Sequence, residues 1–202
     1  MLADMADTLS TIANLVVALV AAASAGAAWL GVSAWRRELQ GRTEYDLARR
    51  ALIGVYRIRD AMARVRAPFM AVWEYADRPG RPPDQRLSDA DDLAYAYQDR
   101  WRSVQEAKSA LDVDLLEAEA IWGDLLKEAT MELSKCIIDL SVNITQYVGA
   151  QRGTRMDPQR MAHVERVIWP MGTDEQPDEY GERLAQVISV FDEKLRRHLR
   201  RT

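Results

Sequence analysis

The chain of 202 residues has few of the side chains from which catalytic and metal sites are built. It has one cysteine, Cys136, and two histidines, His163 and His198. A single cysteine cannot form a disulfide within the chain, which agrees with a reducing compartment. No HExxH, Glu-x-x-His or CxxC pattern and no glycine-rich turn between a strand and a helix occurs. The common zinc, di-iron, redox and nucleotide sites therefore have no support, and we expect no enzyme activity, cofactor or metal.

The few reactive side chains have ordinary structural explanations. Cys136 falls between Leu133 and Leu140 on an apolar helical stripe. We therefore expect a small buried hydrophobic side chain there, not a reactive thiol. For His163 and His198 we likewise expect structural roles.

Charge is also absent from a long stretch near the N-terminus. Residues 8–35 carry no ionisable side chain, and Arg36 and Arg37 follow at once. Residues 12–35 would form about 36 Å of helix, enough to cross a hydrocarbon layer roughly 30 Å thick. A cleaved signal peptide would need a basic start and a shorter apolar run, whereas this chain begins with two aspartates and no Lys or Arg. The sequence predicts an N-terminal tail and one transmembrane helix within residues 1–35.

The arginines beside this stretch predict its orientation. Basic residues follow the predicted span directly, and none precedes it. By the positive-inside rule, the N-terminus is expected outside and residues 36–202 in the cytoplasm. Residues 36–66 carry nine Arg and four acidic side chains, a balance of +5, against −7 over residues 67–202.

Such a basic segment has two interpretations. It can attract anionic lipid headgroups by about 1 kcal/mol per charge close to the surface, or it can be a solvated face that also signals topology. The candidate lipid contacts are Arg36, Arg37, Arg42, Arg49 and Arg50.

Small residues form a stripe within the predicted span. Ala18, Ala22 and Gly26 recur at intervals of four, a spacing that lets two transmembrane helices approach closely. This face could make a homodimer, or alanine could simply be common in the segment.

Residues 36–202 are long enough for one domain with a sizeable core, and their apolar residues recur at helical steps of three and four. The pattern predicts an all-α fold, a cytoplasmic antiparallel bundle of about four helices. Pro68 is expected to kink or interrupt the first helix, and a break near Asp112 to Asp114 to separate the second from the third. The expected helices span residues 43–76, 88–111, 114–150, 158–167 and 178–201.

The start of the second helix carries an acidic cluster. Ser88 is expected to cap the helix with Asp91 in capping-box spacing, while Asp89 and Asp92 complement the positive end of the helix dipole. A structural role therefore explains the cluster better than a metal site.

The segment after the span, from Trp35 to Arg50, with Val55 to Ala61 and Val65 to Phe69, resembles uncharacterised bacterial single-span membrane proteins with a helical cytoplasmic region. The resemblance covers residues 30–70. It implies a protein of the bacterial inner membrane and supplies no activity or catalytic residue.

These observations favour a membrane-tethered interaction or scaffold protein with a protein partner, held in the bilayer by one span. One alternative is a ligand-sensing or signalling module with a cavity among Tyr97, Trp101, Trp122 and Tyr147. Another is a membrane-perturbing effector with self-associating spans. The basic C-terminal tail of an otherwise acidic domain gives no specific signal for nucleic acid.

Overall fold

The computed structural model describes the backbone of residues 2–85, 88–170 and 177–200. Before Gly41 it describes side chains only at 19–20, 24, 26–32, 35–36 and 38–39. In these ranges every regular element is a helix, so the predicted all-α class is confirmed. The elements are α1 (Leu2–Val65), η1 (Val72–Glu74), α2 (Ala90–Trp122), η2 (Gly123–Leu126), α3 (Lys127–Gln151), α4 (Pro158–Ile168) and α5 (Glu179–Leu199).

The chain divides into two compact units, Met1–Glu44 and Tyr45–Thr202. The first unit is helical from Leu2 onward. Within it, Arg42 pairs with Glu38 one turn earlier at 2.6 Å. Among the helices as far as they are described, none combines the length and apolarity needed to cross a membrane.

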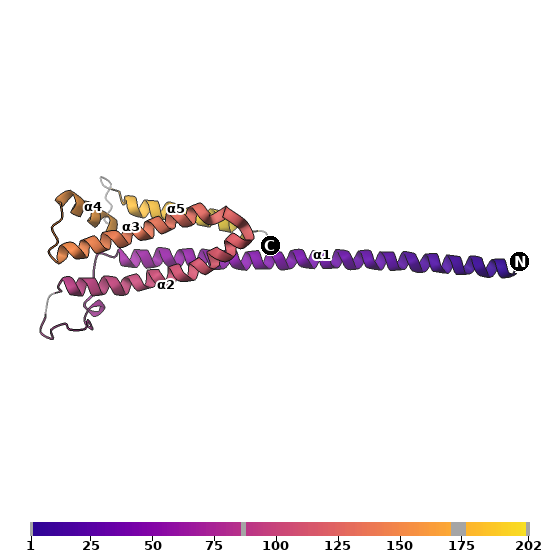
Figure 1. Ribbon diagram of the computed structural model, residues 1–202, viewed down its shortest axis with the longest axis horizontal. Coiled ribbons are helices and arrows are strands. Elements are labelled where there is room, and N and C mark those ends of the chain that lie inside the picture. The colour runs from indigo at the N-terminus through magenta and orange to yellow at the C-terminus, as the bar shows by residue number, and fades with distance from the viewer. Residues whose placement is uncertain (1, 86–87, 171–176, 201–202) are drawn as a thin grey trace. The chain divides into compact units, whose positions relative to one another are not determined.

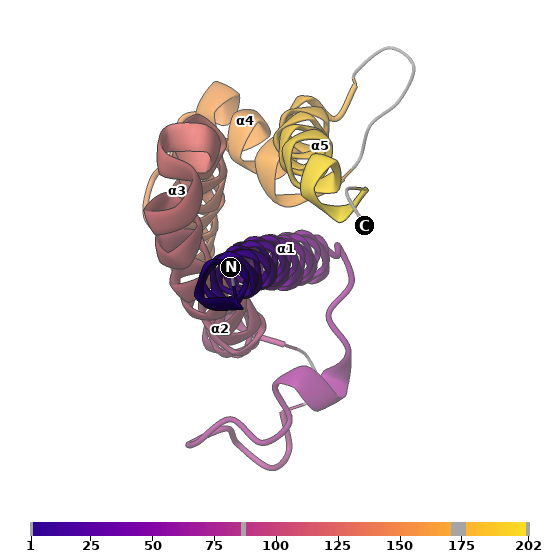
Figure 2. The ribbon, with the colours of Figure 1, turned by 90° about the vertical axis from the view of Figure 1, so that its right-hand side faces the viewer.

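The second unit is an antiparallel helical bundle, as predicted. Figures 1 and 2 show α2, α3 and α5 alongside the part of α1 that follows Tyr45, with α4 beside α3 and α5. Successive long helices run in opposite directions. Arg50 of α1 pairs with Asp114 of α2, whereas Ala67, just after α1, accepts a hydrogen bond from Arg100, nearer the start of α2. Asp91 near the start of α2 pairs with Arg152 after α3, and Tyr180 of α5 bonds to Cys136 whereas Lys194 bonds to Leu125, before α3. A Cβ on Gly54 would meet Leu111 Cδ1 at 3.0 Å, so this glycine lets α1 and α2 approach closely.

The core is built from the apolar stripes of these helices, as the periodicity predicts. The predicted stripe of α1 is buried up to Val65. The largest fully buried side chains are Leu47, Val55, Ile58, Met62, Val65, Val104, Leu111, Leu133, Leu140, Ile168, Phe191 and Leu195.

The first helix ends earlier than the expected residue 76. Helix α1 stops at Val65, and a loop with the short η1 follows. Pro68 explains the end, because proline disfavours the helical conformation of the residue before it and has no N–H to donate. Phe69 and Trp73 continue the apolar spacing of the expected helix and are therefore predicted to be buried. That prediction is wrong, because their side chains are 87% and 77% exposed.

The break between the second and third helices also differs from the prediction. Helix α2 continues without interruption through Asp112 and Asp114 to Trp122, and the chain turns at Gly123. Gly123 has φ 62° and ψ −139°, a conformation that is essentially restricted to glycine. Asp112 and Asp114 do not interrupt α2. The helix ends where Gly123 adopts its non-helical backbone conformation.

The cap of α2 lies one residue later than expected. Asp89, not Ser88, is the N-cap and accepts a hydrogen bond from the Asp92 N–H at 2.7 Å. Asp92 completes the capping box in place of Asp91. The acidic cluster therefore has the structural role that the sequence suggests, at shifted positions.

Asp92 also ties the preceding loop, between α1 and α2, to the start of α2. Its carboxylate is fully buried and accepts hydrogen bonds from Arg78 at 2.7 Å and Arg81 at 3.1 Å. Burial acts to raise the pKa of Asp92, but the hydrogen bonds from the two guanidiniums outweigh it and hold the pKa below its usual value.

Arg66 is buried, although its position off the apolar stripe predicts that it faces outward. It donates to the Val167 carbonyl at 2.8 Å and pairs with Asp178 at 2.7 Å, and it lies 4.7 Å from the ring centroid of Tyr180. Arg66 thus connects the end of α1 to the end of α4 and the start of α5.

Candidate functional site

Apolar side chains outside the core stripes gather on α2 and α3. Leu116 is 68% exposed, Ile138 62% and Met131 51%. Isolated exposed apolar residues are normal, but several that share the surface of two adjacent helices indicate an interaction site. The surface between α2 and α3 is therefore the candidate functional site.

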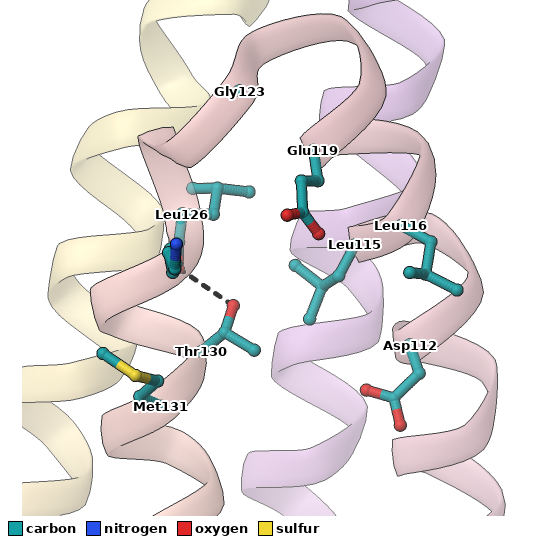
Figure 3. Close-up of a pocket in the computed structure, with 9 residues that line it drawn as sticks. Asp112, Leu115, Leu116, Glu119, Gly123, Leu126, Thr130 and Met131 are labelled. Atoms are coloured by element: carbon teal, nitrogen blue, oxygen red, sulfur yellow. Dashed lines mark hydrogen bonds between the residues drawn. The ribbon is translucent and has the colours of Figure 1, made fainter.

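Two hollows lie along the boundary between these helices. The first, of about 420 Å³, is next to the Gly123 turn. Figure 3 shows Leu115 and Glu119 of α2 and Thr130 of α3 directed toward the space between the helices. The Thr130 hydroxyl donates to the Leu126 carbonyl at 2.9 Å, so the wall that it forms is mainly apolar.

The second hollow, of about 370 Å³, lies toward the other end of the same two helices. Tyr97 and Trp101 line it from α2, and Ile144 and Val148 line it from α3. Arg152 closes its end and pairs with Asp91 at 2.8 Å.

The two hollows share one surface, because their lining residues continue one another at heptad steps. On α2 these are Gln98, Trp101 and Asp112, with Gln105 and Lys108 at the intervening heptad positions. Residues 3, 4 and 7 apart share one face of a helix, so both hollows belong to one groove. We call this surface the α2–α3 groove.

The same spacing holds on α3. Met131 lines the first hollow and Thr145 the second, and Ser134 and Ile138 lie between them at steps of three and four. Between the two hollows, Ile138 offers exposed apolar area.

Charge is distributed unevenly along the groove. Asp112 and Glu119 line the hollow beside the Gly123 turn, together with Lys127. Lys108 pairs with Asp112 at 2.5 Å, which leaves Glu119 as an exposed carboxylate near the turn. The opposite end has the cation Arg152. A segment that binds here is therefore favoured when its basic side chains lie near Glu119.

The aromatic residues expected to surround a ligand cavity are only partly together. Tyr97 and Tyr147 meet edge to face, with ring centroids 6.4 Å apart, and Trp101 lines a hollow with Tyr97. Trp122 does not join them, because it stacks on His198 of α5 at 4.4 Å near the Gly123 turn. Trp122 is the last residue of α2, whereas Tyr97 and Trp101 lie near its start, so the length of this helix separates Trp122 from the others.

The positions of Cys136 and His163 agree with the structural roles expected for them. Cys136 is fully buried in the core as expected, and burial raises the pKa of its thiol. His163 is exposed on α4.

The candidate lipid contacts lie on α1 on both sides of Glu44. Arg36 and Arg49 are exposed, and Arg42 is exposed and pairs with Glu38. Arg50 instead binds Asp114 at 3.0 Å and Glu117 at 2.5 Å on α2, so part of its charge is used within the bundle. The side chain of Arg37 lies outside the described residues.

The predicted association face is described only in part. The side chains of Ala18 and Ala22 lie outside the described residues. At Gly26, an added Cβ would meet no atom within 4 Å.

Sequence reasoning missed the groove, although a signal for it is present. Leu116, Met131 and Ile138 are large apolar residues that fall off the buried stripes of their helices. Such residues become informative only once the pairing of α2 with α3 is known, because the groove belongs to both helices.

The fold and the groove define an all-helical bundle protein with an open face between two of its helices. A scan against models of protein families gives no match, and comparisons with curated proteins and with solved structures find none either.

Proposed function

We propose that this chain is a membrane-tethered interaction protein and that its α2–α3 groove binds a helix of a partner protein. The observation that carries the proposal is the heptad-spaced groove with a hollow at each end. An amphipathic helix anchors its own side chains at i, i+3, i+4 and i+7, which is the spacing of the groove walls.

The groove supports a helical occupant more than an extended one. Its walls are two helices, with no open strand edge that could pair with an extended peptide. The hollows of about 420 and 370 Å³ can each take one or two large side chains. Exposed Leu116 and Ile138 supply apolar area between and beside them.

The tether is proposed from the sequence. Residues 8–35 have no ionisable side chain, and the first arginines follow at once. A single span there, with the N-terminus outside, would hold the bundle at the cytoplasmic surface of the inner membrane. Arg36, Arg42 and Arg49 would then lie close to anionic headgroups.

Site-specific photo-crosslinking in native membranes tests the groove. A photoreactive amino acid at Met131 should form an adduct of defined mass with one partner protein. The double substitution L116E and I138E, made in that background, should reduce the adduct at least about tenfold, because apolar anchors at the centre of an interface carry most of its affinity. The substituted positions are exposed, so the melting temperature should change little.

Ile53 provides the matched control. It is a partly exposed apolar residue of α1 and lines neither hollow. I53E should leave the adduct intact. An adduct that survives L116E with I138E, or that consists only of two copies of this chain, would rule out the proposed partner helix.

A further inference from the structure

A third cavity, of about 220 Å³, is lined mainly by aromatic residues. Phe69 and Tyr75 come from the loop after α1, Tyr97 from α2, Tyr147 from α3 and Trp169 from the end of α4. Segments that are far apart in the sequence thus bring five rings to one site.

Three of these rings stand nearly perpendicular to their neighbours. Tyr97 and Tyr147 have an interplanar angle of 82°, and Tyr147 and Trp169 have 75° at a centroid distance of 5.2 Å. Rings arranged edge to face present both walls and a floor to a ligand, which a parallel stack does not.

Arg100 of α2 holds the loop after α1 that lines one side of the cavity. Arg100 donates hydrogen bonds to the carbonyl oxygens of Ala67 and Phe69, at 2.8 and 2.6 Å, and pairs with Glu74 at 2.5 Å. The hydrogen bond from Arg100 holds the pKa of Glu74 below its usual value against the opposing effect of burial. Phe69 is therefore held at the mouth of the cavity although its ring is largely exposed.

The cations nearest the cavity are paired with carboxylates, Arg81 with Asp92 at 3.1 Å and Arg100 with Glu74 at 2.5 Å. Arg81 stacks over Tyr75 at 5.3 Å, but within the described part of the chain no arginine or lysine stacks on Tyr97, Tyr147 or Trp169. Burial first, and then the negative charge of Glu165, raises the pKa of Tyr147.

We propose that this aromatic cavity binds the trimethylammonium group of a small organic cation. The faces of Tyr and Trp rings attract such groups through their quadrupoles, and a quaternary ammonium needs no hydrogen-bond acceptor. The volume suits this head group with a short tail, since pockets for larger ligands measure about 300–1,000 Å³. The inference goes beyond the proposed function and does not depend on it.

Calorimetric titration of the full chain, in a detergent without a choline headgroup, tests the charge requirement. The probes are choline and its neutral carbon isostere, 3,3-dimethylbutan-1-ol. Choline should bind at least about tenfold more tightly, because only choline gains the cation–π attraction. Equal binding of the two probes, or no binding of choline, would overturn the proposal.

Paired substitutions locate the site. Y147F keeps the ring and should retain choline binding, whereas Y147L should weaken it about tenfold. W73L removes an exposed aromatic side chain that does not line the cavity and should leave the affinity unchanged. Loss of binding in W73L equal to that in Y147L would contradict this assignment.

The source of the head group is tested separately. Phosphatidylcholine nanodiscs that compete with choline would identify a lipid headgroup, and the absence of competition a free metabolite. Both results support recognition of trimethylammonium, and the choline–isostere comparison remains the test that can refute it.

Discussion

Arg100 shows how single residues organise the loops of this protein. Its guanidinium is almost fully buried and meets Glu74 and two backbone carbonyls, so four hydrogen bonds replace those that an irregular loop cannot make with itself. Arg66 and Asp92 have similar roles elsewhere in the bundle. In each case a buried charge is paired and hydrogen-bonded, which offsets its desolvation.

Removal of one such partner should be costly. We expect R100A to lower the free energy of unfolding by about 3–5 kcal/mol, because the Glu74 carboxylate and two carbonyls would stay buried without their donor. Urea denaturation of the full chain in mild detergent measures the change.

Arg102 is the control, since it is exposed and its pair with Asp99, at 3.4 Å, is solvated. R102A should change stability by less than about 1 kcal/mol. Similar losses in the two variants would show that the Arg100 hydrogen bonds contribute no more than a surface pair.

These buried arginines are also where the sequence is least informative. Arg66 lies off the apolar stripe of α1, as a solvent-facing residue would. Its partner Asp178 is 112 positions later, and periodicity within one helix cannot report a contact of that range. The burial of Cys136 was predictable, because it depends only on its own stripe.

At the scale of the elements, the stripes and the bounds of α4 and α5 were predictable, whereas the ends of α1 at Val65 and of α2 at Trp122 were not. Apolar periodicity identifies the faces of α2, α3 and α5 because burial of those faces is the main source of helix stability in a bundle. The turn at Gly123 depends on one backbone conformation. Buried apolar residues continue at helical spacing on both sides of it, so the apolar pattern does not mark the turn. The α2–α3 groove was not predictable either, because periodicity within one helix does not show which two helices pair.

Gly123 gives a test at this scale. G123A should destabilise the protein by about 1–3 kcal/mol, because a Cβ makes the backbone conformation there strained. G149A places the same methyl group within α3, where it meets only Thr154 at 3.7 Å. That variant should be neutral or gain about 0.5–1 kcal/mol from higher helix propensity.

Thermal unfolding of both variants distinguishes the causes. A loss in G123A with no loss in G149A assigns the cost to the turn. Equal behaviour would mean that α2 and α3 can join by another route, such as continuation of the helix through residue 123.

For the whole molecule, the proposed tether makes a prediction about location. Two arginines in the middle of the uncharged stretch, V16R and L19R, should cost about 5–7 kcal/mol of insertion free energy, more than its few strongly apolar residues supply. Most of the protein should then leave the membrane fraction, as measured by alkaline extraction and sedimentation.

The control adds the same charge to the bundle surface. I53R with V113R changes two exposed apolar positions outside the predicted span and should leave the protein in the membrane fraction. If the V16R and L19R protein sediments with the membranes as fully as this control does, the proposed span is wrong.

The antiparallel order of the bundle has a mechanical consequence. Tyr45, where the bundle begins, and the end of α5 lie at the same end of the second unit, because Tyr56 bonds to Asp192 while Arg66, just after the end of α1, pairs with Asp178, the N-cap of α5. If the proposed span anchors the N-terminus, a pulling force on the C-terminus would therefore peel α5 from α1 turn by turn. Peeling breaks contacts one after another, whereas shear would load them all at once, so we expect this bundle to unfold at a lower force than a bundle loaded in shear.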